Sequence, residues 1–519
     1  MILLRSLLSA LVIPTGLGLS PKPLPRLVVV ISIDQFRADY LLRWKTQWTG
    51  GFRRLLAEGA VFPNGRQDHA LTETAPGHST ILSGRDPAHT GIVLNEFGVG
   101  DTAYPILGVP TGAGASPNRF QGTTLVDWMR KQDSLFRFLS VSGKDRSAIL
   151  MVGRSRGPVF WYRGGRFTTS RYYGDSLPPW LLGWNARLRT EHLVGKYWPL
   201  ARADSFYAET DSEPYENGGK GVTFPHRLPT DSALAAKALS TSPWLDSLTL
   251  DAALAGATAL GLGQRDTPDL LIVGLSATDY IGHAFGPDSR EIHDQLLRLD
   301  GWLGSFLDAL AVRVPPDRIV VVLTADHGVT SYPEFSIQHG RPGGRVPLGV
   351  IVREANAAIT GRNPHRSPVL EETDGLIYGD SARVRSLGVS PESLATALLQ
   401  RVWRLPGVVN AWTPATLGAS PHDVDAARWM RALPRSFSWF VAASIKPGYV
   451  WSDQVGNAEH GSTNPDDVNV PIVFLGSGFK PGVYPDTVRT TDIAPTLARL
   501  LEVKPEGDLD GRAIKKILR

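Results

Sequence analysis

Short apolar runs rich in β-branched residues recur along this chain and constrain its fold more than any other feature. They occupy residues 27–33, 270–275, 318–323 and 471–475. Such runs are typical of strands that are buried on both faces in the middle of a parallel sheet. Helical patterns lie between them, over residues 49–58, 289–312 and 491–501. This alternation predicts an α/β fold with a central, mostly parallel sheet flanked by helices.

Two segments depart from the alternation. Residues 154–245 are rich in Trp, Tyr, Gly, Pro and Arg, and residues 335–450 are mixed, with several Pro and Gly. We interpret both segments as insertions into the α/β core and expect them to pack together as a lid or cap. The expected organisation is therefore one domain over residues 21–519 that carries an inserted cap.

The N-terminus has the composition of an export signal. Arg5 precedes a mostly apolar stretch over residues 6–19, which suits the core of a signal peptide and is short for a membrane span. We expect a signal peptide at residues 1–20 and a periplasmic or secreted protein. A buried N-terminal helix is the alternative, but Pro14, Gly16 and Gly18 argue against it. Integral membrane association is not expected, because no later segment is apolar for long enough to span a bilayer.

Composition excludes several other kinds of site. The chain has no cysteine, which excludes disulfides, thiolate zinc sites and a cysteine nucleophile. The formal net charge is +4 over 519 residues, and no run of Lys and Arg stands out. Nucleic-acid binding is therefore not expected. The oligomeric state is left open by the sequence.

Aspartates follow three of the four apolar runs. Asp34 comes directly after the first run, and Asp279 and Asp326 follow the second and third within a few positions. A lone aspartate after a strand is usually a helix N-cap or a turn residue. Here three aspartates follow the carboxyl ends of different strands. They are therefore expected at the edge of the sheet where ligands bind in open α/β folds.

Histidines accompany these aspartates. His283 follows Asp279 by four positions, so the two side chains share one face of a helix. Carboxylate and imidazole together suit zinc, whereas carboxylates alone would suit magnesium or calcium. Two catalytic metal sites, each with three protein ligands and an open position, can be built. The sets are Asp279, His283 and His460, and Asp34, Asp326 and His327.

A hydroxyl-rich segment at residues 71–79 lies between the first strand and an expected helix that begins near Gly77. Hydroxyl groups at a helix start are usually N-caps. Beside metal ions a threonine here can instead act as a nucleophile, because coordination lowers the pKa of its hydroxyl group. A helix N-terminus also favours an incoming phosphate group.

Together these motifs resemble the alkaline phosphatase superfamily, and most closely its bacterial PafA-type phosphatases. The matching pieces follow the family order from residue 34 to residue 461. They are Asp34, the segments 72–78 (TETAPGH), 91–95 (GIVLN), 144–146 (KDR), 160–162 (FWY), 279–287 (DYIGHAFGP) and 325–328 (ADHG), and His460-Gly461. The resemblance implies an alkaline phosphatase-like core that uses one threonine nucleophile and two Zn²⁺ per chain.

The resemblance also implies roles for particular residues. Thr74 would be the nucleophile and a ligand of the metal at Asp34, Asp326 and His327, and it would form a phosphothreonine. Asn95, Lys144 and Arg146 would hold the phosphate oxygens. Charged residues on a surface turn are the plain alternative for Lys144 and Arg146.

The implied activity is hydrolysis of small-molecule phosphate monoesters, with release of inorganic phosphate. Lys144 and Arg146 favour monoesters, because two cations beside the metals neutralise the extra negative charge that a monoester has over a diester. The alternative is a nucleotide pyrophosphatase or phosphodiesterase of the same superfamily, which shares the threonine and both metals. A non-catalytic metal-binding protein that has kept the fold is the alternative from a different class.

Overall fold

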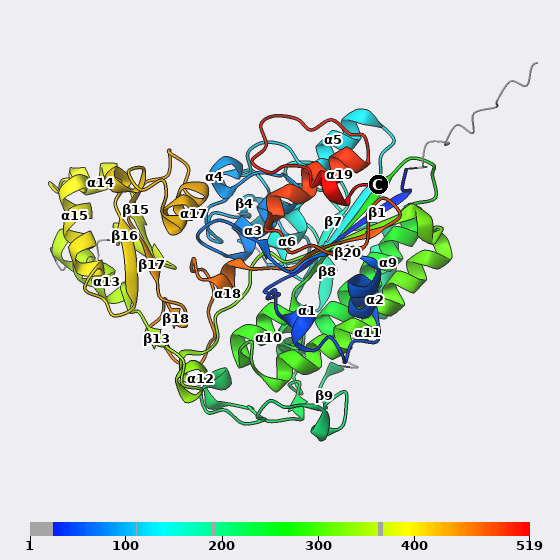
Figure 1. The fold of residues 1–519 in the computed structure, drawn as a ribbon, viewed down its shortest axis with the longest axis horizontal. Coiled ribbons are helices and arrows are strands. Elements are labelled where there is room, and N and C mark those ends of the chain that lie inside the picture. Colours follow the sequence, from blue (N-terminus) through cyan, green and yellow to red (C-terminus); the bar gives the residue numbers. More distant parts are fainter. Residues whose placement is uncertain (1–23, 111, 189–192, 362–366) are drawn as a thin grey trace, which may run out of the picture.

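The computed structural model describes residues 24–110, 112–188, 193–361 and 367–519 (Figure 1). The signal peptide expected at residues 1–20 lies outside the described residues. Among the helices in the described ranges, none has both the length and the apolar character needed to cross a membrane.

A nine-stranded sheet forms the centre of the molecule, in the order β20-β2-β19-β12-β1-β11-β6-β7-β8. The strands from β12 to β7 run parallel, whereas β19 and β8 pair antiparallel with their neighbours. The predicted α/β fold with a mostly parallel sheet is confirmed. The bounds are β1 (Leu27–Ile33), β2 (Ala60–Phe62), β6 (Phe138–Ser142), β7 (Val159–Arg163), β8 (Arg166–Thr168), β11 (Asp269–Leu275), β12 (Ile319–Thr324), β19 (Ile472–Gly476) and β20 (Gly482–Val483).

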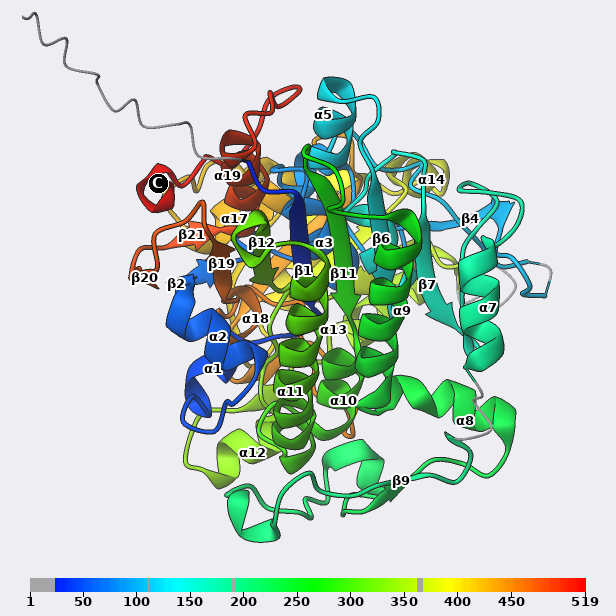
Figure 2. The ribbon, with the colours of Figure 1, turned by 90° about the vertical axis from the view of Figure 1, so that its right-hand side faces the viewer.

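Helices cover both faces of this sheet, because successive side chains of a strand point to opposite sides. Val29 and Ile31 of β1 pack in one apolar core with α2 (Gly51–Glu58), α9 (Trp244–Leu260) and α11 (Arg290–Arg313). Figure 2 shows α9 and α11 together on this face. Val28 and Val30 pack in a second core. Its helices are α3 (Thr74–Ile81), α5 (Leu125–Gln132), α6 (Asp145–Leu150) and α19 (Ile493–Leu500).

A separate four-stranded antiparallel sheet lies beside the main body (Figure 1). It is packed against helices by an apolar core of its own. The whole unit falls within residues 335–450, one of the two segments interpreted as insertions. Its elements are α13 (Leu348–Ile359), β14 (Leu370–Thr373), β15 (Leu376–Gly379), α15 (Pro391–Val402), β16 (Val408–Trp412) and β17 (Trp439–Ile445).

The other presumed insertion, residues 154–245, does not belong to this unit. Its strands β7 and β8 extend the main sheet at one edge. Their side chains Tyr162 and Phe167 are buried in the main core rather than in a cap. The structure therefore places this segment partly in the core, because its aromatic strands bury their rings against α7 (Pro179–Arg187) and α9.

Candidate active site

The predicted metal ligands meet at one edge of the main sheet. In the parallel register Ile33 of β1 lies opposite Leu275 of β11, and Ser32 lies opposite Thr324 of β12. The three strands therefore end together, and the residues that follow each of them arrive at the same place. Asp279 and His283 stand on α10 (Ala277–Phe285), which begins directly after β11. His460 comes from the loop between β18 (Tyr449–Val450) and α18 (Pro465–Val468).

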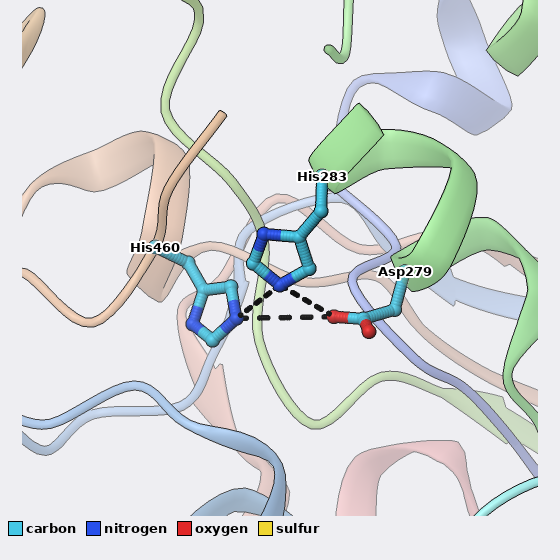
Figure 3. Close-up of side chains that lie close together, drawn as sticks. All are labelled: Asp279, His283 and His460. Atoms are coloured by element: carbon cyan, nitrogen blue, oxygen red, sulfur yellow. Dashed lines mark hydrogen bonds and ion pairs between the residues drawn. The ribbon is translucent and has the colours of Figure 1, made fainter. Parts of the chain in front are cut away.

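The side chains of Asp279, His283 and His460 point toward one another (Figure 3). His283 Nε2 lies 3.4 Å from Asp279 Oδ1, and His460 Nε2 lies 3.8 Å from the same oxygen. The two Nε2 atoms are 3.2 Å apart. One ion can be reached by all three ligand atoms, since they lie within 4.8 Å of one another. The structure thus brings the first predicted set together.

The second predicted set lies next to the first. His327 Nε2 is 3.5 Å from Asp34 Oδ1 and 3.5 Å from Asp326 Oδ2. All three residues are buried. Asp34, Asp279 and His327 also have ligand atoms within 4.8 Å of one another. Asp279 is therefore placed between the two sets, closer to the second than the sequence indicated.

The three histidines are oriented alike. The Nδ1 atoms of His283, His327 and His460 each contact a backbone carbonyl oxygen at 2.7, 2.9 and 2.8 Å; these carbonyls belong to Ala458, Gly328 and Thr72. A carbonyl oxygen can only accept, so each Nδ1 carries the proton and each Nε2 keeps its lone pair for the centre of the site. Among the described residues, His327 Nε2 and Asp34 Oδ1 are buried without a hydrogen-bond partner. This donor set fits a metal site.

Buried negative charge dominates the electrostatics of the site. Burial raises the pKa of Asp34 well above its ordinary value, and Asp279 and Asp326 raise it further. Burial also acts to raise the pKa of Asp279, but Lys144 and His283 outweigh burial and hold that pKa low. Three carboxylates this close to one another repel each other, and the described side chains do not supply enough positive charge to balance them. Bound cations would provide the missing positive charge.

Thr74 is the first residue of α3, three positions before the helix start expected at Gly77. It is buried, and its Oγ1 lies 3.4 Å from Lys144 Nζ. Asn95 Oδ1 accepts a hydrogen bond from the next backbone amide, Ala75 N, at 2.8 Å. The helix approaches the metal ligands closely at Gly77, where a Cβ atom would stand 2.1 Å from the carbonyl oxygen of Asp326. Only glycine permits this approach.

Lys144 and Arg146 flank Thr74 from the start of α6. Lys144 Nζ lies 2.8 Å from Asp34 Oδ2 and also pairs with Asp279. Burial lowers the pKa of Lys144, but these two carboxylates outweigh burial and raise it, so the side chain is a cation. Arg146 contacts Asp145 at 3.4 Å, and its Nε is buried without a partner. Lys144 is buried and the Arg146 side chain is 28% exposed, so neither is a fully solvated charge on a surface turn.

Gln35 is a site residue that the sequence interpretation missed. Its backbone N donates to Asp326 Oδ1 at 3.1 Å, and its side-chain Nε2 donates to Asp279 Oδ1 at 3.2 Å. It therefore holds carboxylates from both ligand sets. Gly282 leaves room for the amide, since a Cβ atom there would stand 1.8 Å from Gln35 Oε1. The only signal in the sequence is that glycine, between Asp279 and His283.

A second missed pair connects the site to the four-stranded sheet. Glu73 Oε2 accepts from Asn95 N at 2.8 Å, and burial raises the pKa of Glu73 to about 8. Asp374, in the turn between β14 and β15, interacts with Glu73. It also lies so close to Gly461, the neighbour of His460, that a Cβ atom there would stand 2.2 Å from Asp374 Cγ. No motif marks Asp374, because its contact joins segments that are far apart in the sequence.

Comparisons with known proteins agree with this geometry. A family model described as type I phosphodiesterase / nucleotide pyrophosphatase matches residues 28–343. Alkaline phosphatase PhoV of Synechococcus elongatus is 31% identical over 95% of this chain and 93% of its own length. Alkaline phosphatase PhoK of Sphingomonas sp. is 32% identical over 94% of this chain and 91% of its own.

The fold has a solved counterpart over nearly its whole length. The crystal structure of wild-type alkaline phosphatase PafA matches with a TM-score of 0.89 and 28% identity, over 96% of this chain and 99% of that chain. This chain belongs to the type I phosphodiesterase / nucleotide pyrophosphatase family, in the PafA-type group of the alkaline phosphatase superfamily.

Proposed function

We propose that this protein is an alkaline phosphatase that hydrolyses small-molecule phosphate monoesters through a phosphothreonine on Thr74 and releases inorganic phosphate. One observation carries the proposal. The hydroxyl group of Thr74 lies at a helix N-terminus, 3.4 Å from a buried lysine that also pairs with two carboxylates of the ligand sets. The full-length relatives named alkaline phosphatases support the same activity.

Two zinc ions are the proposed cofactors. One would be held by Asp279, His283 and His460, and the other by Asp34, Asp326, His327 and Thr74. When bound, zinc supplies Lewis acidity, which lowers the pKa of a hydroxyl group and neutralises charge on a phosphoryl group. The mixture of carboxylate and imidazole ligands, with every histidine Nε2 free to face the centre, supports zinc over magnesium or calcium.

The protein side chains then have distinct roles in the proposed reaction. Thr74 Oγ attacks the phosphorus atom in line with the departing alcohol oxygen, and the ester bond breaks as the phosphothreonine bond forms. The cations Lys144 and Arg146 stabilise the equatorial oxygens, with the side-chain NH2 group of Asn95 as a further hydrogen-bond donor. Water then attacks the same phosphorus atom, which frees Thr74 and releases phosphate.

The second candidate function is a nucleotide pyrophosphatase or phosphodiesterase, which the description of the family model favours. The buried Lys144 and the partly exposed Arg146 support the monoesterase, because a diester has less charge to neutralise.

Replacing Arg146 by alanine separates the two functions. We expect kcat/KM for nitrophenyl phosphate to fall about 100-fold or more, and kcat/KM for bis-nitrophenyl phosphate to fall far less, because only the monoester needs the second cation. Steady-state rates of both proteins on both substrates give the comparison. Equal losses, or a wild-type protein that prefers the diester, would support the phosphodiesterase instead.

Two further features belong to the proposal. We propose that the four-stranded unit within residues 335–450 acts as a cap, since Asp374 reaches Glu73 beside the nucleophile. We also propose a periplasmic or secreted location, which rests on the composition of residues 1–20.

A further inference from the structure

A cavity lies at the carboxyl end of α10. Its volume is about 300 Å³. Carboxylates and aromatic rings line most of its wall, and Phe285 and Gly286 at the end of α10 close one side. The carboxylates are those of Glu209, Glu213, Glu216 and Asp288, and the rings are those of Tyr215, Phe285, Tyr332 and Phe335.

Two of these carboxylates are already compensated within the protein. Glu209 pairs with His293 at 2.9 Å and accepts from Trp44 Nε1 at 3.2 Å. Asp288 lies 3.4 Å from Arg43 and accepts from Ser331 Oγ at 2.5 Å. The basic side chains of the wall are Arg43 and His339. Arg43 pairs with Asp39 and Asp288, and His339 Nδ1 contacts the carbonyl oxygen of Phe335.

Glu216 is not compensated. Its side chain is buried, with the residue only 3% exposed, and its Oε2 has no hydrogen-bond partner. Within the part of the chain that the structure describes, no lysine, arginine or histidine forms an ion pair with it. A buried carboxyl group without a partner is costly, and a cation in the cavity would remove that cost.

We propose that this cavity binds a small primary alkylammonium ion, with Glu216 as its ion-pair partner. An ammonium group has three N–H donors, which suit a wall of carboxylate oxygens. The rings of Tyr215 and Tyr332, with centroids 5.0 Å apart, provide the aromatic surface that cations favour and that methylene groups contact.

A metal ion fits this cavity less well. Among the described residues, the groups of three or more His, Asp and Glu side chains whose ligand atoms lie within 4.8 Å of one another are both at the active site. The carboxylates of this cavity do not converge in this way, although a calcium ion needs several oxygen ligands around it.

Binding of an ammonium ion has a signature of its own. Burial, together with Glu291 and Glu213, raises the pKa of Glu216 to about 9, so the free protein keeps this carboxyl group protonated at pH 7.5. An adjacent cation favours the carboxylate and lowers that pKa. Binding of the ammonium ion should therefore release a proton.

Isothermal titration calorimetry of the zinc-loaded protein with n-butylammonium chloride at pH 7.5 tests the proposal. The titration is run in PIPES and in HEPES, which differ in ionisation enthalpy; Tris is avoided because it is itself a primary ammonium ion. We expect saturable binding of one ion per chain, with an observed enthalpy that differs between the buffers as proton release requires.

Variants locate the site. Glu216→Gln should weaken binding about tenfold or more and abolish the dependence on buffer, because the amide has no charge and no titrating proton. Glu58→Gln, at an exposed glutamate of α2, is the matched control and should bind as the wild type does. Unfolding temperatures of both variants check that they are folded. Glu213→Gln provides a second variant, with an expected smaller loss of affinity, should Glu216→Gln not fold.

Other results would overturn the proposal. These are the absence of saturable binding, equal affinity of the wild type and Glu216→Gln, or binding without proton release. Calcium chloride that binds in place of butylammonium, and loses affinity in Glu216→Gln, would show a metal site instead.

Discussion

At the scale of single residues, Gln35 connects the two metal-ligand sets. It follows Asp34 in the sequence, and it hydrogen-bonds to Asp326 through its backbone and to Asp279 through its side chain. Its backbone adopts a φ of 60°, which non-glycine residues rarely do. Such strain persists only where the surroundings enforce it. We interpret Gln35 as a positioning residue that fixes the spacing of the carboxylates.

The variant Gln35→Glu tests that role. It replaces the amide donor to Asp279 by an acceptor and adds a negative charge among three buried carboxylates. We expect zinc affinity to fall about 10- to 100-fold, as is common when a group that orients a metal ligand is lost. Competition with a zinc chelator measures the affinity. The exposed Gln132→Glu on α5 is the control, and an unchanged affinity in Gln35→Glu would show that Gln35 does not position the ligands.

Candidate ligating and reacting groups could be named from the sequence, but the groups that orient them were missed. Asp34, Asp279 and Asp326 follow the carboxyl ends of parallel strands, which is where ligands generally bind in open α/β folds. Gln35 acts across 244 positions of the sequence on Asp279, and its role depends on a backbone conformation that composition does not reveal. Contacts of this kind become visible only when the segments are brought together.

At the scale of elements, α10 is held in place from a neighbouring helix. Asp246 on α9 accepts hydrogen bonds from Ser276 N and Ala277 N at 2.8 and 2.9 Å, the free amides at the start of α10. Ser276 itself makes no capping bond with its side chain. Because α10 carries Asp279 and His283, Asp246 fixes where these two ligands stand.

Asp246 also makes stability depend on pH. Burial raises the pKa of Asp246 to about 7, above the value of about 4 for an unfolded aspartate. Between pH 4 and 7 the folded state binds a proton that the unfolded state lacks. The stabilising contribution is therefore complete below pH 4 and is lost as the pH rises through 7.

The variant Asp246→Asn removes this dependence. The side-chain oxygen of the new asparagine can accept the same two backbone hydrogen bonds. Its N–H group can donate to Gln295 Oε1, which has no partner among the described residues, once the Gln295 amide rotates. We expect the free energy of unfolding of the variant, relative to the wild type, to rise between pH 5 and pH 8 by on the order of 1–3 kcal/mol. Urea unfolding at both pH values measures it, and a constant difference would contradict the assignment.

Element boundaries were predicted well where burial decides them. The apolar runs correspond to β1, β11, β12 and β19 within one residue at each end. The helix α3 begins three residues before the start expected near Gly77, and Pro76 lies in its first turn. Proline is tolerated in the first turn of a helix, where its missing N–H is not needed.

At the scale of the whole molecule, two sheets with their connections contribute residues to the site. The main sheet and its connections supply the predicted metal ligands and Thr74, and the four-stranded sheet supplies Asp374 at the edge of the site. The composition distinguished residues 335–450 from the core, but it did not distinguish the strands β7 and β8 from loops. These strands are short and lie among many Gly and Pro residues, so only the pairing of β7 with β6 and of β8 with β7 identifies them.

Removal of the metals should weaken the whole fold. Without cations, Asp34, Asp279 and Asp326 repel one another in a buried site, and the free energy of metal binding no longer favours the folded state. Dialysis against EDTA should therefore abolish phosphatase activity and lower the unfolding temperature, and added zinc should restore both. Calorimetry with and without chelator checks this; an unchanged unfolding temperature would argue against occupied metal sites.

The covalent intermediate tests the account most directly. Wild-type protein is quenched in acid during turnover of nitrophenyl phosphate, and its peptides are analysed by mass spectrometry. The account predicts one phosphate group, on Thr74, and predicts that Thr74→Ala binds zinc normally but loses at least about a thousandfold in kcat. Phosphate on another residue, or Thr74→Ala with near-normal turnover, would contradict it.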